Sequence, residues 1–232
     1  MEELQKLLSD TYYTLVLMVA LQIVTTIIGI MNRKKFVELK YFHFYSMAGL
    51  FQTVITIVSL LLFNQELKSK LIEFSVNIFL LIEFLLIYHL FFQIILIKKL
   101  RNILKLFFVS FLIYVVFMWY LTDAFYKRSP KLFPIETVVI LFPTVLFFLQ
   151  LFKLPATCNL FNQPAFWINI GILIAFTCTL PLYTLDVYLP KFIDNNFYFY
   201  YINFIAYSIL FTLICRAYLC KIEQVSIDEP KR

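Results

Sequence analysis

One acidic residue, Glu83, lies in the middle of a long apolar stretch, where a charge is costly if the stretch crosses a membrane. Its helical neighbours at three, four and seven residues are all apolar, so any partner must come from another segment. Lys and Arg are absent from the middle of the other apolar stretches, which leaves hydroxyl and amide groups as partners. We expect Glu83 to face the interior of a helix bundle and to be largely protonated at neutral pH. It is then either a site for a ligand, proton or cation, or a structural group that joins helices by hydrogen bonds.

Further polar residues are placed to extend a site around Glu83. Glu73 and Asn77 are one helical turn apart and share a face near the outer end of the same segment. They line an outer vestibule together with Glu136 or Asp186, or else Glu73 simply reaches interfacial water. The residues predicted to bind a ligand or proton are Glu83, Asn77, Glu73, Asn169, Asn203 and Tyr207.

The segment that contains Asn169 also carries a strip of small residues. Gly171, Ala175 and Thr179 repeat every four residues, which makes one face of a helix narrow. Such a strip allows a neighbouring helix to approach closely, and we favour structural packing as its role. A ligand role for Asn169 is the alternative.

Two histidines are the only metal-binding imidazoles in the chain. His43 and His89 lie at similar distances from the turn that joins the second and third apolar segments, so they are expected at similar depth. A catalytic zinc ion normally takes three protein ligands, and two histidines are too few unless Cys or Glu completes the site. We interpret them as interfacial residues, with a metal pair as the alternative, and we predict no cofactor.

The composition indicates what holds these residues in place. Of the 232 residues, 62% are hydrophobic and 15% are charged, both departures from a soluble domain in the direction of a membrane protein. Seven apolar segments are long enough to cross a bilayer. They lie near 12–31, 41–63, 71–97, 103–122, 134–152, 165–188 and 198–220. The sequence therefore predicts an all-α membrane protein, with a bundle of seven transmembrane helices over 1–221 and a short cytoplasmic tail over 222–232.

Basic residues in the loops predict the orientation of this bundle. They are most frequent in the first and third loops and at the C-terminal end, at Arg33, Lys34, Lys35, Lys40, Lys98, Lys99, Arg101, Lys105, Arg216, Lys221, Lys231 and Arg232. Since the more basic side of a membrane protein faces the cytoplasm, we expect the N-terminus outside and the C-terminus in the cytoplasm. These basic loops interact with anionic lipid and are candidates for contact with a cytoplasmic or membrane protein partner. No nucleic-acid-binding motif is present.

The sequence leaves several functions open. HExxH, GxSxG and P-loop motifs are all absent, so we do not expect an enzyme. A membrane sensor or signalling module with a ligand pocket near the third, sixth and seventh helices is our first interpretation. A small proton- or cation-coupled transporter and a structural subunit of a larger membrane complex are the alternatives.

Parts of the chain resemble a family of short, uncharacterised seven-helix proteins of Bacteroidetes-type bacteria. The resemblance lies in 82–86 with Lys98 and Lys99, in Phe166 and Trp167 through 171–174, and in the aromatic start of the seventh segment. Some of these proteins also look like the membrane sensor regions of histidine kinases. The resemblance implies a seven-helix fold in a bacterial inner membrane, and it implies no activity.

Overall fold

The computed structural model describes residues 2–36, 38–62, 65–122, 131–152, 160–188 and 196–220, with side chains placed for 13–36, 38–61, 67–120, 131–152, 160–185 and 201–220. The predicted tail, 222–232, lies outside the described residues. Seven α-helices occupy the described chain: α1 (Glu2–Asn32), α2 (His43–Leu62), α3 (Gln65–Ile94), α4 (Lys98–Thr122), α5 (Leu132–Leu151), α6 (Pro164–Tyr188) and α7 (Asn196–Tyr218). A short 3-10 helix, Leu160–Asn162, precedes α6.

All seven helices are long and apolar enough to cross a membrane, which confirms the predicted all-α, seven-helix fold of a multi-pass membrane protein. Some helices begin earlier than the apolar segments do. The helix α1 begins at Glu2 instead of near residue 12, and α4 begins at Lys98 instead of near residue 103. The physical reason is that the backbone hydrogen bonds of a helix continue through polar side chains into the interface, whereas hydropathy marks only the apolar part.

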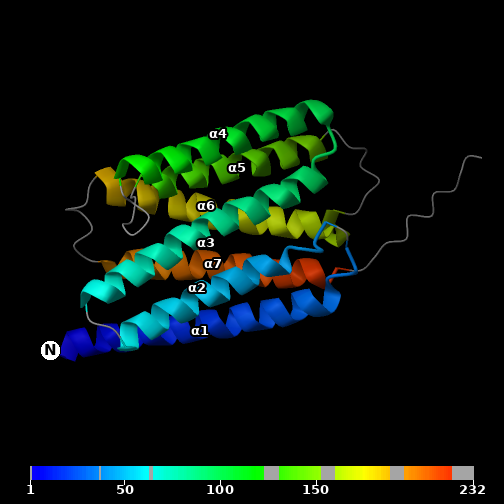
Figure 1. Ribbon diagram of the computed structural model, residues 1–232. Coiled ribbons are helices and arrows are strands. Elements are labelled where there is room, and N and C mark those ends of the chain that lie inside the picture. The colour runs from blue at the N-terminus through cyan, green and yellow to red at the C-terminus, as the bar shows by residue number, and fades with distance from the viewer. Residues whose placement is uncertain are drawn as a thin grey trace, which may run out of the picture.

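Six of the helices form a closed ring. Along this ring α1 contacts α2, α2 contacts α3, α3 contacts α5, α5 contacts α6, α6 contacts α7, and α7 returns to α1. The remaining helix, α4, lies outside the ring against α3 and α5 (Figure 1). Helices α6 and α7 make the most extensive contact of any pair. The chain therefore encloses an interior that six helices share, with α4 as an outer layer.

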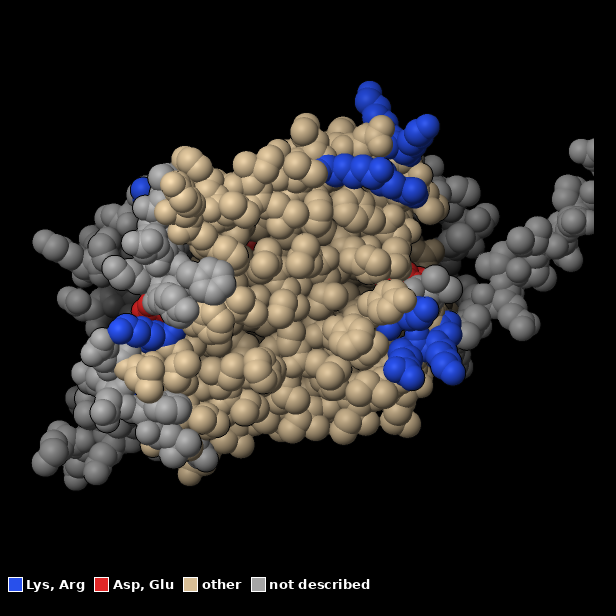
Figure 2. Space-filling model, viewed as in Figure 1, with Lys and Arg blue, Asp and Glu red and all other residues tan. Residues whose placement is uncertain are grey.

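Charge is concentrated at the ends of the bundle. The described Lys and Arg residues at the end opposite the start of α1 are Arg33, Lys34, Lys35, Lys40, Lys98, Lys99, Arg101, Lys105 and Arg216. We call this end the basic end. At the other end, the N-terminal end, the basic residues with described side chains are Lys68, Lys70 and Lys131. On the face in Figure 2 a broad belt without Lys or Arg separates the two ends, as the bilayer requires.

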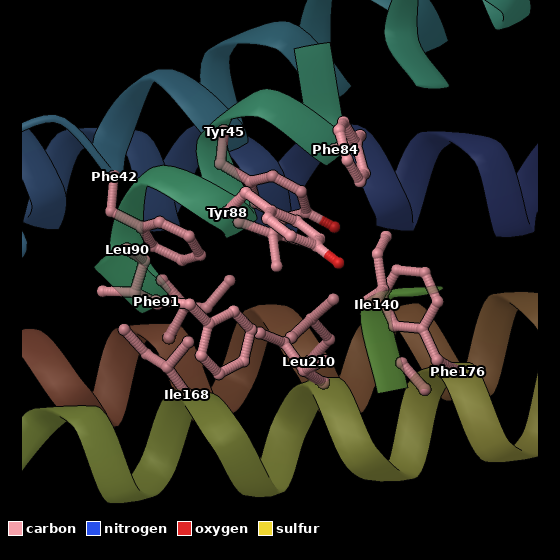
Figure 3. Packing of buried hydrophobic residues seen from close by; sticks show 14 of the residues in the cluster. Phe42, Tyr45, Phe84, Tyr88, Leu90, Phe91, Ile140, Ile168, Phe176 and Leu210 are labelled. Carbon is pink, nitrogen blue, oxygen red and sulfur yellow. The ribbon is translucent and has the colours of Figure 1, made fainter. Parts of the chain in front are cut away.

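Large buried side chains fill the ring between Glu83 and the basic end. In Figure 3, Phe91 of α3 lies against Ile168 of α6 and Leu210 of α7, and all three side chains are fully buried. These residues pack the basic-end half of the interior as a protein core. Phe84 and Tyr88 of α3 are also fully buried, but their rings contact Phe108 of α4, outside the ring of helices.

A single glutamine completes the hydrogen bonds of the turn between α3 and α4. Gln150, near the end of α5, is buried, and its Nε2 donates to the carbonyl of Ile94 at 3.0 Å. Its Oε1 accepts from the backbone N–H of Leu96 at 2.8 Å and of Ile97 at 3.3 Å. Backbone groups that have left a helix need such partners, because an unpaired polar group close to lipid is costly. Gln150 thereby fixes α5 to the α3–α4 turn.

Replacing Gln150 with Leu keeps the approximate size of the side chain and removes all three of these hydrogen bonds. We expect the free energy of unfolding to fall by about 2 kcal/mol, because buried or half-buried backbone groups lose their partners. An SDS titration in mixed micelles measures this. Gln93→Leu is the matched control, since the hydrogen bond between Gln93 Nε2 and His89 Nε2 lies within one helix. Equal loss in both variants would contradict the structural role of Gln150.

Candidate functional site

A cavity of about 760 Å³ lies inside the helical ring. Its walls come from α1, α2, α3, α5, α6 and α7, so the pocket predicted near α3, α6 and α7 involves three more helices. Along α3 the lining residues run from Lys68, near the N-terminal end, to Glu83, where the packed core begins. Within the described part of the chain the cavity is therefore confined to the half of the bundle at the N-terminal end. A volume of this size is typical of sites for small organic ligands.

Glu83 is buried at the inner limit of the cavity, as the sequence predicts. The hydroxyl of Tyr45, from α2, donates a hydrogen bond to Glu83 Oε1 at 2.6 Å. Tyr207, from α7, is its second side-chain hydrogen-bond partner. The carboxyl group thus joins three helices of the ring, and its partners are the hydroxyl groups that a membrane interior can offer.

A second buried carboxyl group, Glu136, lines the same cavity from α5 and interacts electrostatically with Glu83. The two lie at similar depth because the Tyr88 hydroxyl donates to the carbonyl of Val139 at 2.9 Å, which fixes α3 against α5. Both helices run in the same direction along the chain path. Glu83 precedes Tyr88 by five residues and Glu136 precedes Val139 by three, so their depths differ by about 3 Å at a rise of 1.5 Å per residue.

The sequence offers Glu136 or Asp186 as a partner of Glu73 in an outer vestibule, and Glu73 and Glu136 do line the same cavity. Glu136 lies deeper than Glu73, at about the level of Glu83, since α5 begins deeper in the bundle than α3 does. The sequence contains no signal for this offset, which depends on how two helices pack. Asp186, the other residue considered for the vestibule, lies outside the described side chains.

The other predicted residues divide into two groups. Glu73, Asn203 and Tyr207 line the cavity. Glu73 accepts a hydrogen bond from Ser69 at 3.1 Å, and Asn203 Oδ1 lies 3.5 Å from the Tyr183 hydroxyl. Asn77 and Asn169 are buried away from the cavity wall. The Nδ2 of Asn169 donates to the carbonyl of Ala165 at 2.7 Å within its own helix, a structural interaction.

The two histidines lie toward the same end of the bundle. His43 is buried near the start of α2, whereas His89 is exposed on α3 and makes an edge contact with Tyr41 at 5.6 Å between ring centroids. That contact places them at similar depth, as predicted. Among the described residues, no group of three or more His, Cys, Asp or Glu side chains is arranged to hold a metal ion.

The floor of the cavity depends on a glycine. A Cβ atom at Gly49 of α2 would lie 3.1 Å from Gln22 Nε2 of α1 and 3.4 Å from Phe211 Cζ of α7. All three residues line the cavity. The absence of a side chain at Gly49 therefore lets α1, α2 and α7 converge next to the buried carboxyl groups.

No protein-family model, curated protein or solved structure matches the chain. The fold defines the class of protein, which is a multi-pass membrane protein of seven helices with an interior cavity that holds paired carboxyl groups.

Proposed function

We propose that the protein is a membrane sensor or signalling module without a catalytic domain of its own, which binds a ligand in the cavity and transmits binding to the basic end. The observation that carries this proposal is the hydrogen bond from Tyr45 to Glu83. It joins the floor of the cavity to the first turns of α2, directly after the basic loop 33–40. On this proposal the basic end faces the cytoplasm and contacts a protein partner.

A continuous series of contacts leads from the cavity to the basic loop. The ring of Tyr45 stacks on Phe42 with a centroid distance of 5.3 Å and an interplanar angle of 8°. The backbone N–H of Phe42 donates to the carbonyl of Leu39 at 3.0 Å, and the Tyr218 hydroxyl of α7 donates to the same carbonyl at 3.3 Å. A change in the position of Tyr45 therefore acts on the loop through this stacked ring and these two hydrogen bonds.

The same three helices form both ends of this connection. Helices α1, α2 and α7 converge at Gly49 on the cavity floor, and they converge again near the basic end at Gly29. A Cβ atom at Gly29 would lie 2.9 Å from His43 Cβ and 3.2 Å from Tyr218 Cε2. Tightly packed elements of this kind shift between discrete arrangements more readily than they deform, which suits a transmitting role.

The test removes one hydroxyl group. Tyr45→Phe should increase the hydrogen exchange rate of backbone amides in 36–42 by about fivefold, because a net hydrogen bond of about 1 kcal/mol no longer holds α2 to Glu83. The measurement is hydrogen exchange by mass spectrometry on the full chain in nanodiscs. Glu83→Gln should also change exchange in this segment, since the amide replaces the acceptor.

Tyr88→Phe is the matched control. It removes a buried tyrosine hydroxyl of the same kind, but that hydroxyl bonds to Val139 of α5 and not to Glu83. We expect exchange in 36–42 to stay at the wild-type rate in this variant. An equal increase in both variants would show general loosening of the bundle, and the proposed transmission through Tyr45 would be wrong.

A proton- or cation-coupled transporter is the second candidate, and the paired carboxyl groups Glu83 and Glu136 favour it. Transport requires that the cavity open to the basic end in another state. Accumulation of a bound cation inside proteoliposomes under an imposed pH gradient would support transport over sensing. The resemblance to bacterial sensor regions supports the first proposal and a bacterial inner membrane as its location.

A further inference from the structure

Two buried oxygen atoms on the cavity wall have no hydrogen-bond donor. Gln22 Oε1 and Glu136 Oε1 are without a partner in the structure, and each side chain is only 3% exposed. Both residues line the cavity. An acceptor that is buried without a donor loses its hydration and gains nothing in return, so a donor from a bound molecule stabilises it. The residues that line the cavity therefore include two acceptors that a ligand with hydrogen-bond donors would satisfy.

The charged residues on the cavity wall indicate the sign of the charge on that ligand. Glu73, Glu83 and Glu136 line the cavity, and among the described residues Lys68 is the only basic side chain that does so. Lys68 lies fifteen residues before Glu83 on α3, which is about 22 Å at 1.5 Å per residue. The inner part of the cavity thus contains two carboxyl groups and no described cationic group. A buried carboxylate is stabilised by a cation that also donates hydrogen bonds.

The size and the aromatic walls indicate an organic ion. The volume of about 760 Å³ is far larger than a metal ion needs, and the described carboxyl groups form no metal cluster. Phe79, Phe133, Phe176 and Tyr183 contribute aromatic rings to the wall. Aromatic faces stabilise both an apolar body and an ammonium group through cation–π contacts.

We propose that the cavity binds an organic cation in which a primary or secondary ammonium group is attached to an apolar body. The ammonium group lies between Glu83 and Glu136 within reach of Gln22, and the apolar body lies against the aromatic wall. The inference rests on the proposed function, because it assigns the ligand class of the same sensor cavity. A free amine and the headgroup of an aminolipid share this chemistry.

Three probes with one scaffold test the class of ligand. They are 4-phenylbutylammonium, the neutral 4-phenylbutan-1-ol and the anionic 4-phenylbutanoate, titrated by calorimetry onto the full chain in phosphatidylglycerol nanodiscs. Empty nanodiscs correct for partition into lipid. We expect saturable binding of the ammonium compound, at least about tenfold tighter than that of the alcohol, because hydrogen bonds to charged groups are the stronger ones. The carboxylate should not bind.

Variants test the site. Glu83→Gln and Glu136→Gln should each weaken binding of 4-phenylbutylammonium by about tenfold or more, since each removes one charge-assisted interaction. Glu38→Gln is the matched control, because Glu38 lies in the basic loop and not on the cavity wall. It should leave the affinity unchanged within about twofold, as is usual for a remote polar substitution.

The outcomes separate this inference from the proposed function. Equal affinity for the alcohol, preference for the carboxylate, or no saturable binding of the ammonium compound would each overturn the organic-cation assignment. Transmission through Tyr45 is tested by hydrogen exchange without any ligand, so its outcome does not depend on the ligand class.

Nanodiscs that contain phosphatidylethanolamine distinguish a free amine from an aminolipid as the natural ligand. If the natural ligand is an aminolipid, phosphatidylethanolamine competes for the cavity, so the apparent affinity for 4-phenylbutylammonium falls and the lipid stays bound in native mass spectra. If the natural ligand is a free amine, the affinity is unchanged and no bound phosphatidylethanolamine is seen.

Discussion

Replacement of Gly171 by Leu should separate α6 from α7 and lower the free energy of unfolding by about 3 kcal/mol or more. A Cβ atom at Gly171 would lie 2.9 Å from Leu210 Cδ1 and 3.4 Å from both Leu210 Cα and Leu213 Cβ. A methyl group already requires Leu210 to move, and the larger side chain meets the α7 backbone. The loss should be large because α6 and α7 form the most extensive helix contact in the fold. An SDS titration in mixed micelles measures it.

Thr177→Leu is the control for this prediction. Thr177 lies on the same helix, but its side chain is exposed on the outer surface of the bundle. Leucine there faces lipid, and we expect stability to change by less than about 0.5 kcal/mol. A tolerated leucine at Gly171 would mean that the two helices are not held at this separation.

Phe84→Ala should destabilise the bundle by about 3 to 4 kcal/mol and release α4 in particular. The Phe84 ring is fully buried and lies 4.3 Å from the Phe111 ring and 5.4 Å from the Phe108 ring, between centroids. Both partners belong to α4, which contacts the ring of helices mainly through α3 and α5. Truncation leaves a cavity at the centre of this attachment. The unfolding free energy and the hydrogen exchange of α4 amides are the measurements.

The control for Phe84 is the same substitution on the outer face of α4. Phe117 is 55% exposed, so Phe117→Ala removes contacts mainly with lipid. We expect a change of less than about 1 kcal/mol. If exchange in α4 were no faster in Phe84→Ala than in Phe117→Ala, the aromatic cluster would not be what attaches α4.

The close helix contact at Gly171 could be predicted from the sequence, whereas the contact of Phe84 with α4 could not. The strip Gly171, Ala175 and Thr179 predicts a close helix contact, and the structure confirms it at Gly171, which fits against α7. The partner helix could not be named from the strip. Phe84 gives no comparable signal, because in a chain with 28 phenylalanines an aromatic residue is as ordinary on the lipid face as in the core.

By itself, the sequence determined the number of membrane helices and the burial of Glu83. Both depend on local properties, since twenty apolar residues partition into lipid wherever they occur and a lone carboxyl group among them must turn inward. The tertiary structure alone decided that six helices enclose a cavity, that Tyr45 donates to Glu83, and that Glu136 lies at a depth similar to that of Glu83. Those facts depend on which helices contact one another and on the offset of one helix relative to another along the axis of the bundle. Packing between segments that are distant in the sequence determines these contacts and offsets, and hydropathy along the chain does not predict them.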